Sequence, residues 1–365
     1  MKKKIILVLV AFISISVYVV SSNGKLLFAI LNYRLKIPDS PFGSDFDRYG
    51  NLYTLSFLPQ FRLKDPLMVK AYPDSVKTGK RDINLYVLCN SYIFAFVKTD
   101  KIFTGVKRYW FARHELYDNP VVKFDSTQKN IMLIEVTEHS LGNFTGPDLL
   151  MNSLKTVPSK NSADTLPSQY VNPTNYAMLA PLKNMIFNPR INDALGFNLF
   201  GYIFTTPIKQ AKAGFNYNVF NRVDPSVKIS PDGKHLFAAP TVDPRSHRSS
   251  FKPIDDEKIN MYVTSFNKAY DHYKSLGFDE VYLTIVPNPV AIIAPEMGTY
   301  NHLTERIQNH PDMRMPFIDI YTVFKNSKEP IFQRSDTHWN YNGFRIWVDE
   351  FNKVLAKHVN AEKQP

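Results

Sequence analysis

Three residues of this chain have the types and spacing needed for acyl transfer through a serine. Asp336 and His338 stand two residues apart, so in an extended segment their side chains project to the same side. The carboxylate can then accept a hydrogen bond from one ring nitrogen of His338, which leaves the other nitrogen to take a proton from a hydroxyl. Ser91 follows an apolar, strand-like run and can provide that hydroxyl as a nucleophile. The pattern predicts a catalytic triad of Ser91, His338 and Asp336.

Each of these residues also has a structural interpretation. Asp336 can cap the helix that follows it, His338 can be a surface side chain, and Ser91 can be the N-cap of a short helix. Cys89 stands two residues before Ser91 and is an alternative nucleophile, although a cysteine in a buried strand is usually unreactive. The sequence alone leaves these alternatives open.

The triad requires a fold that brings distant segments of the chain together, and the apolar patterns provide one. The predicted strands are 83–88, 129–136, 280–286 and 315–320. The predicted helices are 191–204, 256–276, 303–308 and 344–355. A hairpin is expected around Pro231-Asp232-Gly233. Strands and helices that alternate at these lengths predict an α/β fold with a parallel sheet covered on both faces.

Further candidate residues follow one predicted strand and the Asp-x-His motif. Asn288 comes directly after 280–286, where its amide can stabilise an oxyanion or simply form a turn between two prolines. Trp339 and Tyr341 can stack on a sugar ring or pack beneath the final helix. No His or Cys cluster in the sequence has the spacing of a zinc site, and we predict neither metal nor cofactor.

Length and composition define the class of protein. The chain has 365 residues, 44% of them hydrophobic, which suits one large domain with insertions or two domains. The formal net charge of +11 comes from scattered Lys and Arg, and no nucleic-acid-binding module is recognisable, so we expect no nucleic-acid partner. The single cysteine excludes an internal disulfide.

The N-terminal residues have the order of an export signal. Three lysines follow Met1, a mostly apolar run covers 5–20, and small or polar residues occupy 21–24. The run is marginal in length for a bilayer of about 30 Å, so a cleaved signal peptide and a retained membrane anchor are both open. We expect an exported protein of the periplasm or cell envelope.

The late motif and the early serine carry a resemblance to a known family. Asp336-Thr337-His338-Trp339-Asn340, with the strand end Leu88-Cys89-Asn90-Ser91-Tyr92, resembles the SGNH/GDSL hydrolase superfamily, in particular its branch related to alginate O-acetyltransferases. The strand 281–286 with Pro287-Asn288 is similar to the strand and loop that carry the oxyanion asparagine in that superfamily. Cys89 and Asn90 depart from the usual Gly and Asp before the nucleophile.

The resemblance implies a fold and an activity. The fold is a flavodoxin-like, three-layer α/β/α core, which we assign to 81–139 and 251–360. The residue patterns divide the rest of the chain into a signal or anchor at 1–22, an extension at 23–80 and a partly β insertion at 140–250. The activity is O-acetylation of a cell-surface or secreted polysaccharide through an acyl-serine, with a membrane-bound acyltransferase as the expected partner. The alternatives are a non-catalytic carbohydrate-binding or assembly protein with the same core, and a carbohydrate esterase.

Overall fold

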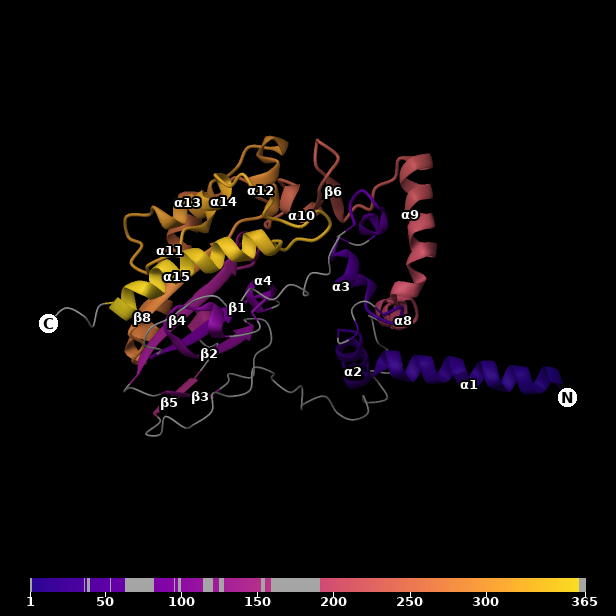
Figure 1. Ribbon diagram of the computed structural model, residues 1–365. Helices are drawn as coiled ribbons and strands as arrows, with labels where there is room; N and C mark the ends of the chain where they lie inside the picture. Colours follow the sequence, from indigo (N-terminus) through magenta and orange to yellow (C-terminus); the bar gives the residue numbers. More distant parts are fainter. Residues whose placement is uncertain are drawn as a thin grey trace. The chain divides into compact units, whose positions relative to one another are not determined.

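The computed structural model divides the chain into two compact units, Met1–Leu67 with Val171–Asp224 and Met68–Tyr170 with Pro225–Pro365 (Figure 1). The structure describes residues 2–35, 37, 40–52, 54–62, 82–94, 96–97, 100–113, 121–124, 128–151, 155–158 and 191–360. Parts of the predicted extension (63–80) and of the predicted insertion (159–190) therefore lie outside the described residues. The unit borders do not coincide with the predicted domain borders.

A parallel sheet forms the centre of the second unit. Its strands lie in the spatial order β2-β1-β4-β8, and every neighbouring pair is parallel. The strands are β1 (Ile83–Cys89), β2 (Val106–Arg113), β4 (Lys129–Thr137) and β8 (Glu280–Val286). All of β1 is buried, as expected for a central parallel strand that is covered on both faces. The predicted α/β class with a parallel sheet is confirmed.

The segment predicted as a strand at 315–320 pairs with β8 at a single position. Phe317 forms a parallel bridge with Leu283, whose N–H donates to the carbonyl of Pro316 at 2.9 Å. Ile318 returns the second hydrogen bond, from its N–H to the carbonyl of Leu283, at 2.8 Å. The pairing extends no further, because Pro316 has no N–H to donate and helix α14 begins at Ile320. The prediction of a strand is corrected to a bridge.

Long helices lie on both faces of the sheet. Helix α11 (Asp256–Ser275) is capped by Asp255, which accepts the N–H of Lys258 at 2.7 Å. Its buried residues pack in one cluster with Leu283 and other side chains of that face. Tyr282 points to the opposite face, because side chains alternate along a strand. There its hydroxyl bonds the Nε2 of His358 at 2.7 Å, so α15 (Tyr341–Asn360) covers that face (Figure 1).

Shorter elements complete the second unit. They are α4 (Ser91–Phe94), η2 (Asp100–Ile102), β3 (Val121–Phe124), α5 (Glu138–Leu141), α6 (Asp148–Met151), β5 (Lys155–Pro158), β6 (Val227–Ile229), β7 (Leu236–Ala238), α10 (Ala239–Val242), α12 (Pro289–Ile293), η4 (Pro295–Met297), α13 (Leu303–Gln308) and α14 (Ile320–Lys325). Strands β6 and β7 form the predicted hairpin, in which Gly233 has a φ of 71°.

The first unit is helical. Its elements are α1 (Lys2–Ser22), α2 (Gly24–Leu35), α3 (Asp45–Tyr49), η1 (Leu55–Phe57), α8 (Ile191–Phe200), η3 (Ile203–Thr205) and α9 (Thr206–Phe220). Helix α1 is long and apolar enough to cross a membrane, judged by length and composition. It is compatible with either a signal sequence or an anchor.

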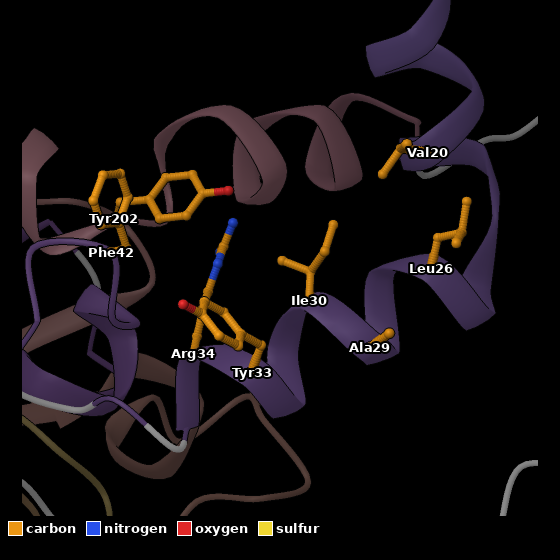
Figure 2. Close-up of a pocket in the computed structure, with 8 residues that line it drawn as sticks. All are labelled: Val20, Leu26, Ala29, Ile30, Tyr33, Arg34, Phe42 and Tyr202. Carbon is orange, nitrogen blue, oxygen red and sulfur yellow. The ribbon is translucent and has the colours of Figure 1, made fainter.

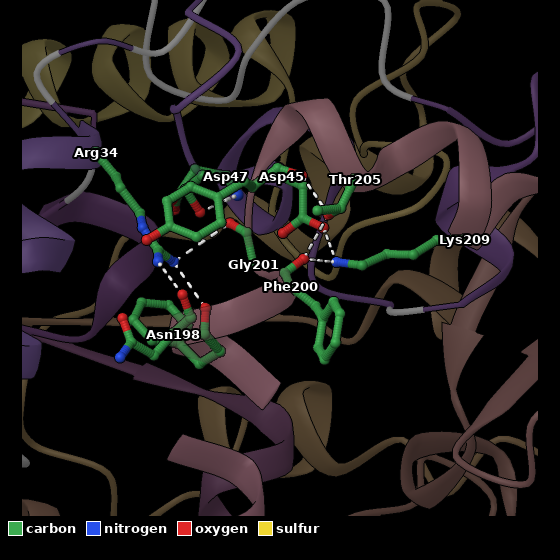
Figure 3. Close-up of polar contacts among 11 residues, drawn as sticks. Arg34, Asp45, Asp47, Asn198, Phe200, Gly201, Thr205 and Lys209 are labelled. Carbon is green, nitrogen blue, oxygen red and sulfur yellow. Dashed lines mark hydrogen bonds and ion pairs between the residues drawn. The ribbon is translucent and has the colours of Figure 1, made fainter. Parts of the chain in front are cut away.

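A buried arginine ties α2 to the end of α8 within this unit. The Arg34 guanidinium donates to the carbonyls of Phe197, Asn198 and Gly201 at 3.0 to 3.3 Å (Figure 3). Its Cζ also lies 3.7 Å from the ring centroid of Tyr202. These carbonyls end α8, where a cation interacts favourably with the helix dipole. Beside this contact lies an apolar pocket of about 560 Å³, lined by residues of α1, α2 and the segments around Phe42 and Tyr202 (Figure 2).

Candidate active site

Ser91, His338 and Asp336 form a hydrogen-bonded chain at the carboxyl end of the sheet. Ser91 follows β1 as the first residue of α4, and its Oγ lies 2.7 Å from the Nε2 of His338. The Nδ1 of His338 lies 2.5 Å from the Oδ1 of Asp336. The same oxygen accepts the backbone N–H of His338 at 2.9 Å, which fixes the loop as well as the ring. The three residues thus have the contacts expected of a nucleophile, a base and an orienting carboxylate.

The loop that carries His338 is closed by backbone hydrogen bonds. Phe332 and Trp339 form an antiparallel bridge, and the N–H of Gln333 donates to the carbonyl of His338 at 3.1 Å. Gly343, in the first turn of α15, lies close against this loop, because a Cβ there would be only 2.4 Å from the carbonyl oxygen of Ile331. A glycine at this position lets α15 approach the loop and hold the base in place.

The turn before Ser91 is held by Asn90. Its Oδ1 accepts the N–H of Tyr92 at 2.9 Å, which makes Asn90 the N-cap of α4. Its own N–H donates to the Oε2 of Glu135 on the neighbouring strand β4 at 2.7 Å, and Glu135 is fully buried. Asn90 therefore supports the turn at the place where the resembling family has Asp. Cys89 is the last residue of β1 and is fully buried, so it does not share the exposure of Ser91.

Tyr92 links the serine segment to the histidine segment. Its hydroxyl donates to the carbonyl of Thr337, and its ring centroid lies 4.6 Å from that of His338. Burial, followed by the charges of Asp336 and Glu135, raises the pKa of Tyr92 well above 10.0, so the hydroxyl stays protonated as a donor. The segments that carry the nucleophile and the base are therefore joined by a second contact beside the triad.

Trp339 and Tyr341 differ in their surroundings. Trp339 is fully buried, and its ring packs against Tyr92 at 5.4 Å and Trp347 at 5.8 Å between centroids. No face of Trp339 is left for a sugar, so the predicted stacking role is wrong for this residue and the packing alternative holds. Tyr341 begins α15 and is half-buried, and its role in substrate binding stays a prediction.

The side chain of Asn288 has hydrogen-bond partners other than the triad. Its Nδ2 donates to the Oγ of Ser250 at 3.0 Å and to the carbonyl of Arg248 at 3.2 Å, and its Oδ1 lies 3.2 Å from the Nδ1 of His139. Both amide hydrogens are thus engaged, and among the described residues none of these bonds reaches the triad. These bonds fit a structural role for Asn288, and its role at the oxyanion stays a prediction.

Two glutamates at the end of β4 are polar residues of this region that the sequence analysis missed. Glu135 accepts from Asn90, and Glu138 accepts the N–H of Asn288 through Oε2 at 2.8 Å. Burial raises the pKa of Glu138 from its ordinary 4.5 to about 7, which outweighs the hydrogen bonds from Asn288 and Ser250 that lower it. The sequence could have identified these residues as candidates for a functional site, because functional groups gather where the strands of a parallel sheet end.

An oxyanion that forms at a carbonyl attacked by Ser91 needs a hydrogen-bond donor. The backbone N–H of Ser91 is suited to this, because the first N–H groups of a helix have no acceptor within the helix. Within the described part of the chain, no three His, Cys, Asp or Glu side chains form a group that could hold a metal ion.

Comparison of the chain with protein-family models, curated proteins and solved structures gave no match. The site is therefore interpreted from its geometry and from the residues that carry the resemblance described above.

Proposed function

We propose that the protein is an exported, serine-dependent acyltransferase of the SGNH type that O-acetylates a cell-surface or secreted polysaccharide. One observation carries the proposal: the unbroken hydrogen-bonded chain from Asp336 through His338 to the Oγ of Ser91. The apolar N-terminal helix supports export. The sheet has the strand order β2-β1-β4-β8 and is continued by the bridge at Phe317. If these five segments are numbered by their order in the chain, their order in the sheet is 2-1-3-4-5, which is the flavodoxin-like order that such a core requires.

The contacts suggest how the reaction would proceed. His338 takes the proton of Ser91 as the Oγ attacks the acyl carbonyl, and Asp336 stabilises the imidazolium that forms. The proton then passes to the leaving group, which departs as the tetrahedral intermediate collapses to an acyl-serine. A sugar hydroxyl, or water in a carbohydrate esterase, attacks this ester while His338 accepts its proton. As the second tetrahedral intermediate collapses, the bond from the acyl carbon to the Oγ of Ser91 breaks, and His338 returns the proton to that oxygen. A membrane-bound acyltransferase is the proposed source of the acetyl group.

Covalent labelling tests the proposal. A fluorophosphonate should label the folded protein at Ser91, and the protein should release acetate from a chromogenic acetyl ester. Ser91→Ala should abolish both signals. Ser275→Ala is a matched control. The hydroxyl of Ser275 donates to the carbonyl of His272 at the exposed end of α11, so this variant should leave both signals unchanged. Acetyl transfer to an oligosaccharide then separates the transferase from the esterase.

A non-catalytic carbohydrate-binding protein is the second candidate, and the engagement of both Asn288 amide hydrogens favours it. Without that side chain the oxyanion loses one expected donor. Folded protein that binds polysaccharide, but is neither labelled at Ser91 nor active on the acetyl ester, would establish this alternative and refute the enzyme.

A further inference from the structure

The exposed apolar side chains are concentrated in the first unit. Every large hydrophobic residue that is exposed in the described part of the chain belongs to it. One group lies on α1 between Ile5 and Ile15, and a second lies at 199–223, on and beside α9. The remaining members are Leu26, Tyr33, Phe42 and Phe46. Soluble proteins rarely leave such groups in water, so this unit is expected to contact an apolar or interfacial phase.

Helix α9 carries its apolar stripe on the outside. Ile208, Phe215 and Val219 are 77%, 57% and 61% exposed, and their spacing of seven and four residues places them on one helical face. Ala213, on the other side of the helix, is buried within the unit. In a helix of a soluble domain the apolar face is the buried one, so the orientation of α9 is reversed.

The charge of α9 fits an anionic surface. The helix contains neither Asp nor Glu. Lys209 is paired with Asp45, whereas Lys212 is exposed on the face of the stripe, four residues after Ile208 and three before Phe215. Basic residues beside an apolar face are typical of helices that lie in the headgroup region of a membrane, where lysine keeps its ammonium group in water.

The end of α1 is packed into the same unit as α9. Asn198 of α8 donates to the Oγ of Ser21 at 3.3 Å, and Ser21 and Asn23 are 1% and 3% exposed. From α8 the chain passes through η3 into α9, and Lys209 of α9 forms an ion pair with the buried Asp45 (Figure 3). The small residues where a signal peptide would be cut are thus part of the fold of this unit.

Within this unit α9 runs across the direction of α1 (Figure 1). A helix that crosses a membrane span in this way runs along the plane of the bilayer rather than through it. Exposed apolar residues on such a helix can enter the boundary between headgroups and acyl chains.

We propose that the first unit is a membrane-seated platform. Helix α1 is retained as the anchor, and the stripe of Ile208, Phe215 and Val219 lies in the headgroup region of the same anionic phospholipid bilayer. The inference uses no residue of the candidate active site, so it stands or falls separately from the proposed activity.

Site-specific fluorescence tests this placement in the full-length chain. In a Cys89→Ala background, Ile208→Cys, Phe215→Cys and Val219→Cys are labelled with an environment-sensitive dye and reconstituted in phosphatidylethanolamine and phosphatidylglycerol vesicles. Lys234→Cys, in the exposed turn of the hairpin, is the matched control. The three stripe positions should show blue-shifted emission and lose quenching by aqueous iodide, while the control remains quenched. Protein purified from cells should retain α1, as read by its intact mass.

Three outcomes overturn the proposal. Iodide quenching of the stripe labels as strong as at residue 234 would place α9 in water. Protection in native membranes but not in pure lipid vesicles would assign the stripe to a protein partner instead of lipid. An N-terminus that begins after Ser22 would show that α1 is removed and cannot be the anchor.

Discussion

The carboxylate of Asp336 offers the sharpest test of the triad. Its Oδ1 accepts both the ring N–H and the backbone N–H of His338, at 2.5 and 2.9 Å, and the side chain is 4% exposed. Asp336→Asn keeps the shape of this side chain and removes its charge. The backbone bond can persist, so the loop should survive while the ring loses its charged partner.

The size of the effect follows from that lost charge. A hydrogen bond to a charged group is worth about 1.5–3 kcal/mol, which corresponds to roughly 10- to 150-fold in rate if it is needed only in the transition state. Asparagine can also donate to Nδ1 and so favour the wrong tautomer, which costs about 10⁴-fold in the well-studied serine proteases. We therefore expect labelling of Ser91 by a fluorophosphonate to slow by about 10- to 10⁴-fold.

The assay is the second-order rate constant for labelling, measured beside the free energy of unfolding in urea. Asp319→Asn is the matched control, because the Oδ1 of Asp319 caps α14 by accepting the N–H of Thr322 at 3.0 Å. That variant changes an aspartate with a similar backbone contact outside the triad. Equal labelling rates in the two folded variants would refute the role assigned to Asp336.

Three further predictions concern residues around the site. Glu138→Gln should remove a pH dependence of stability. In the parent protein the Glu138 carboxyl has a pKa of about 7 when folded and about 4.5 when unfolded, so the folded state holds a proton that the unfolded chain releases. The unfolding free energy of the parent protein should therefore fall by up to about 3 kcal/mol as the pH rises from 4.5 to 7. Urea unfolding at pH 5 and pH 8 checks this, and an equal fall in the variant would contradict it. Tyr92→Phe removes the hydroxyl that donates to Thr337, so unfolding should cost about 1–2 kcal/mol less and labelling of Ser91 should slow; unchanged values of both would argue against the link. Trp339→Ala should lower the unfolding free energy by about 3–5 kcal/mol, as for a buried aromatic, whereas a small loss of stability with weakened sugar binding would restore the stacking role.

Local sequence patterns predicted the elements whose hydrogen bonds and contacts join residues close together in the chain. Helix α11 has a capping aspartate, Asp255, and a regular apolar face in its sequence, and the hairpin has a turn sequence that includes Gly233. Both elements lie where the sequence predicted them. The contact between Asp336 and His338 could be predicted for the same reason, since the two residues are neighbours along one short loop.

Non-local pairing was harder to foresee. Strand β2 contains Lys107 and Arg108, so its sequence does not have the apolar pattern of a buried strand. It forms a strand because it pairs with β1 along its length. Asn288 follows a strand as Ser91 does, but its amide hydrogens are donated to Arg248 and Ser250, residues distant in sequence whose contact with Asn288 no local pattern predicts. Helix α9 was not predicted, because Gly214 and Asn216 in its middle are poor helix formers and its apolar residues are sparse.

Ser91 and His338 stand 247 residues apart in the chain, yet their side chains lie 2.7 Å apart in the fold. In a chain that is exported from its N-terminus, the serine segment would arrive well before the histidine loop. Until that loop has arrived and folded, the proposed nucleophile would have no base and could not form an acyl-enzyme. The proposed activity would therefore begin only after both segments have been exported.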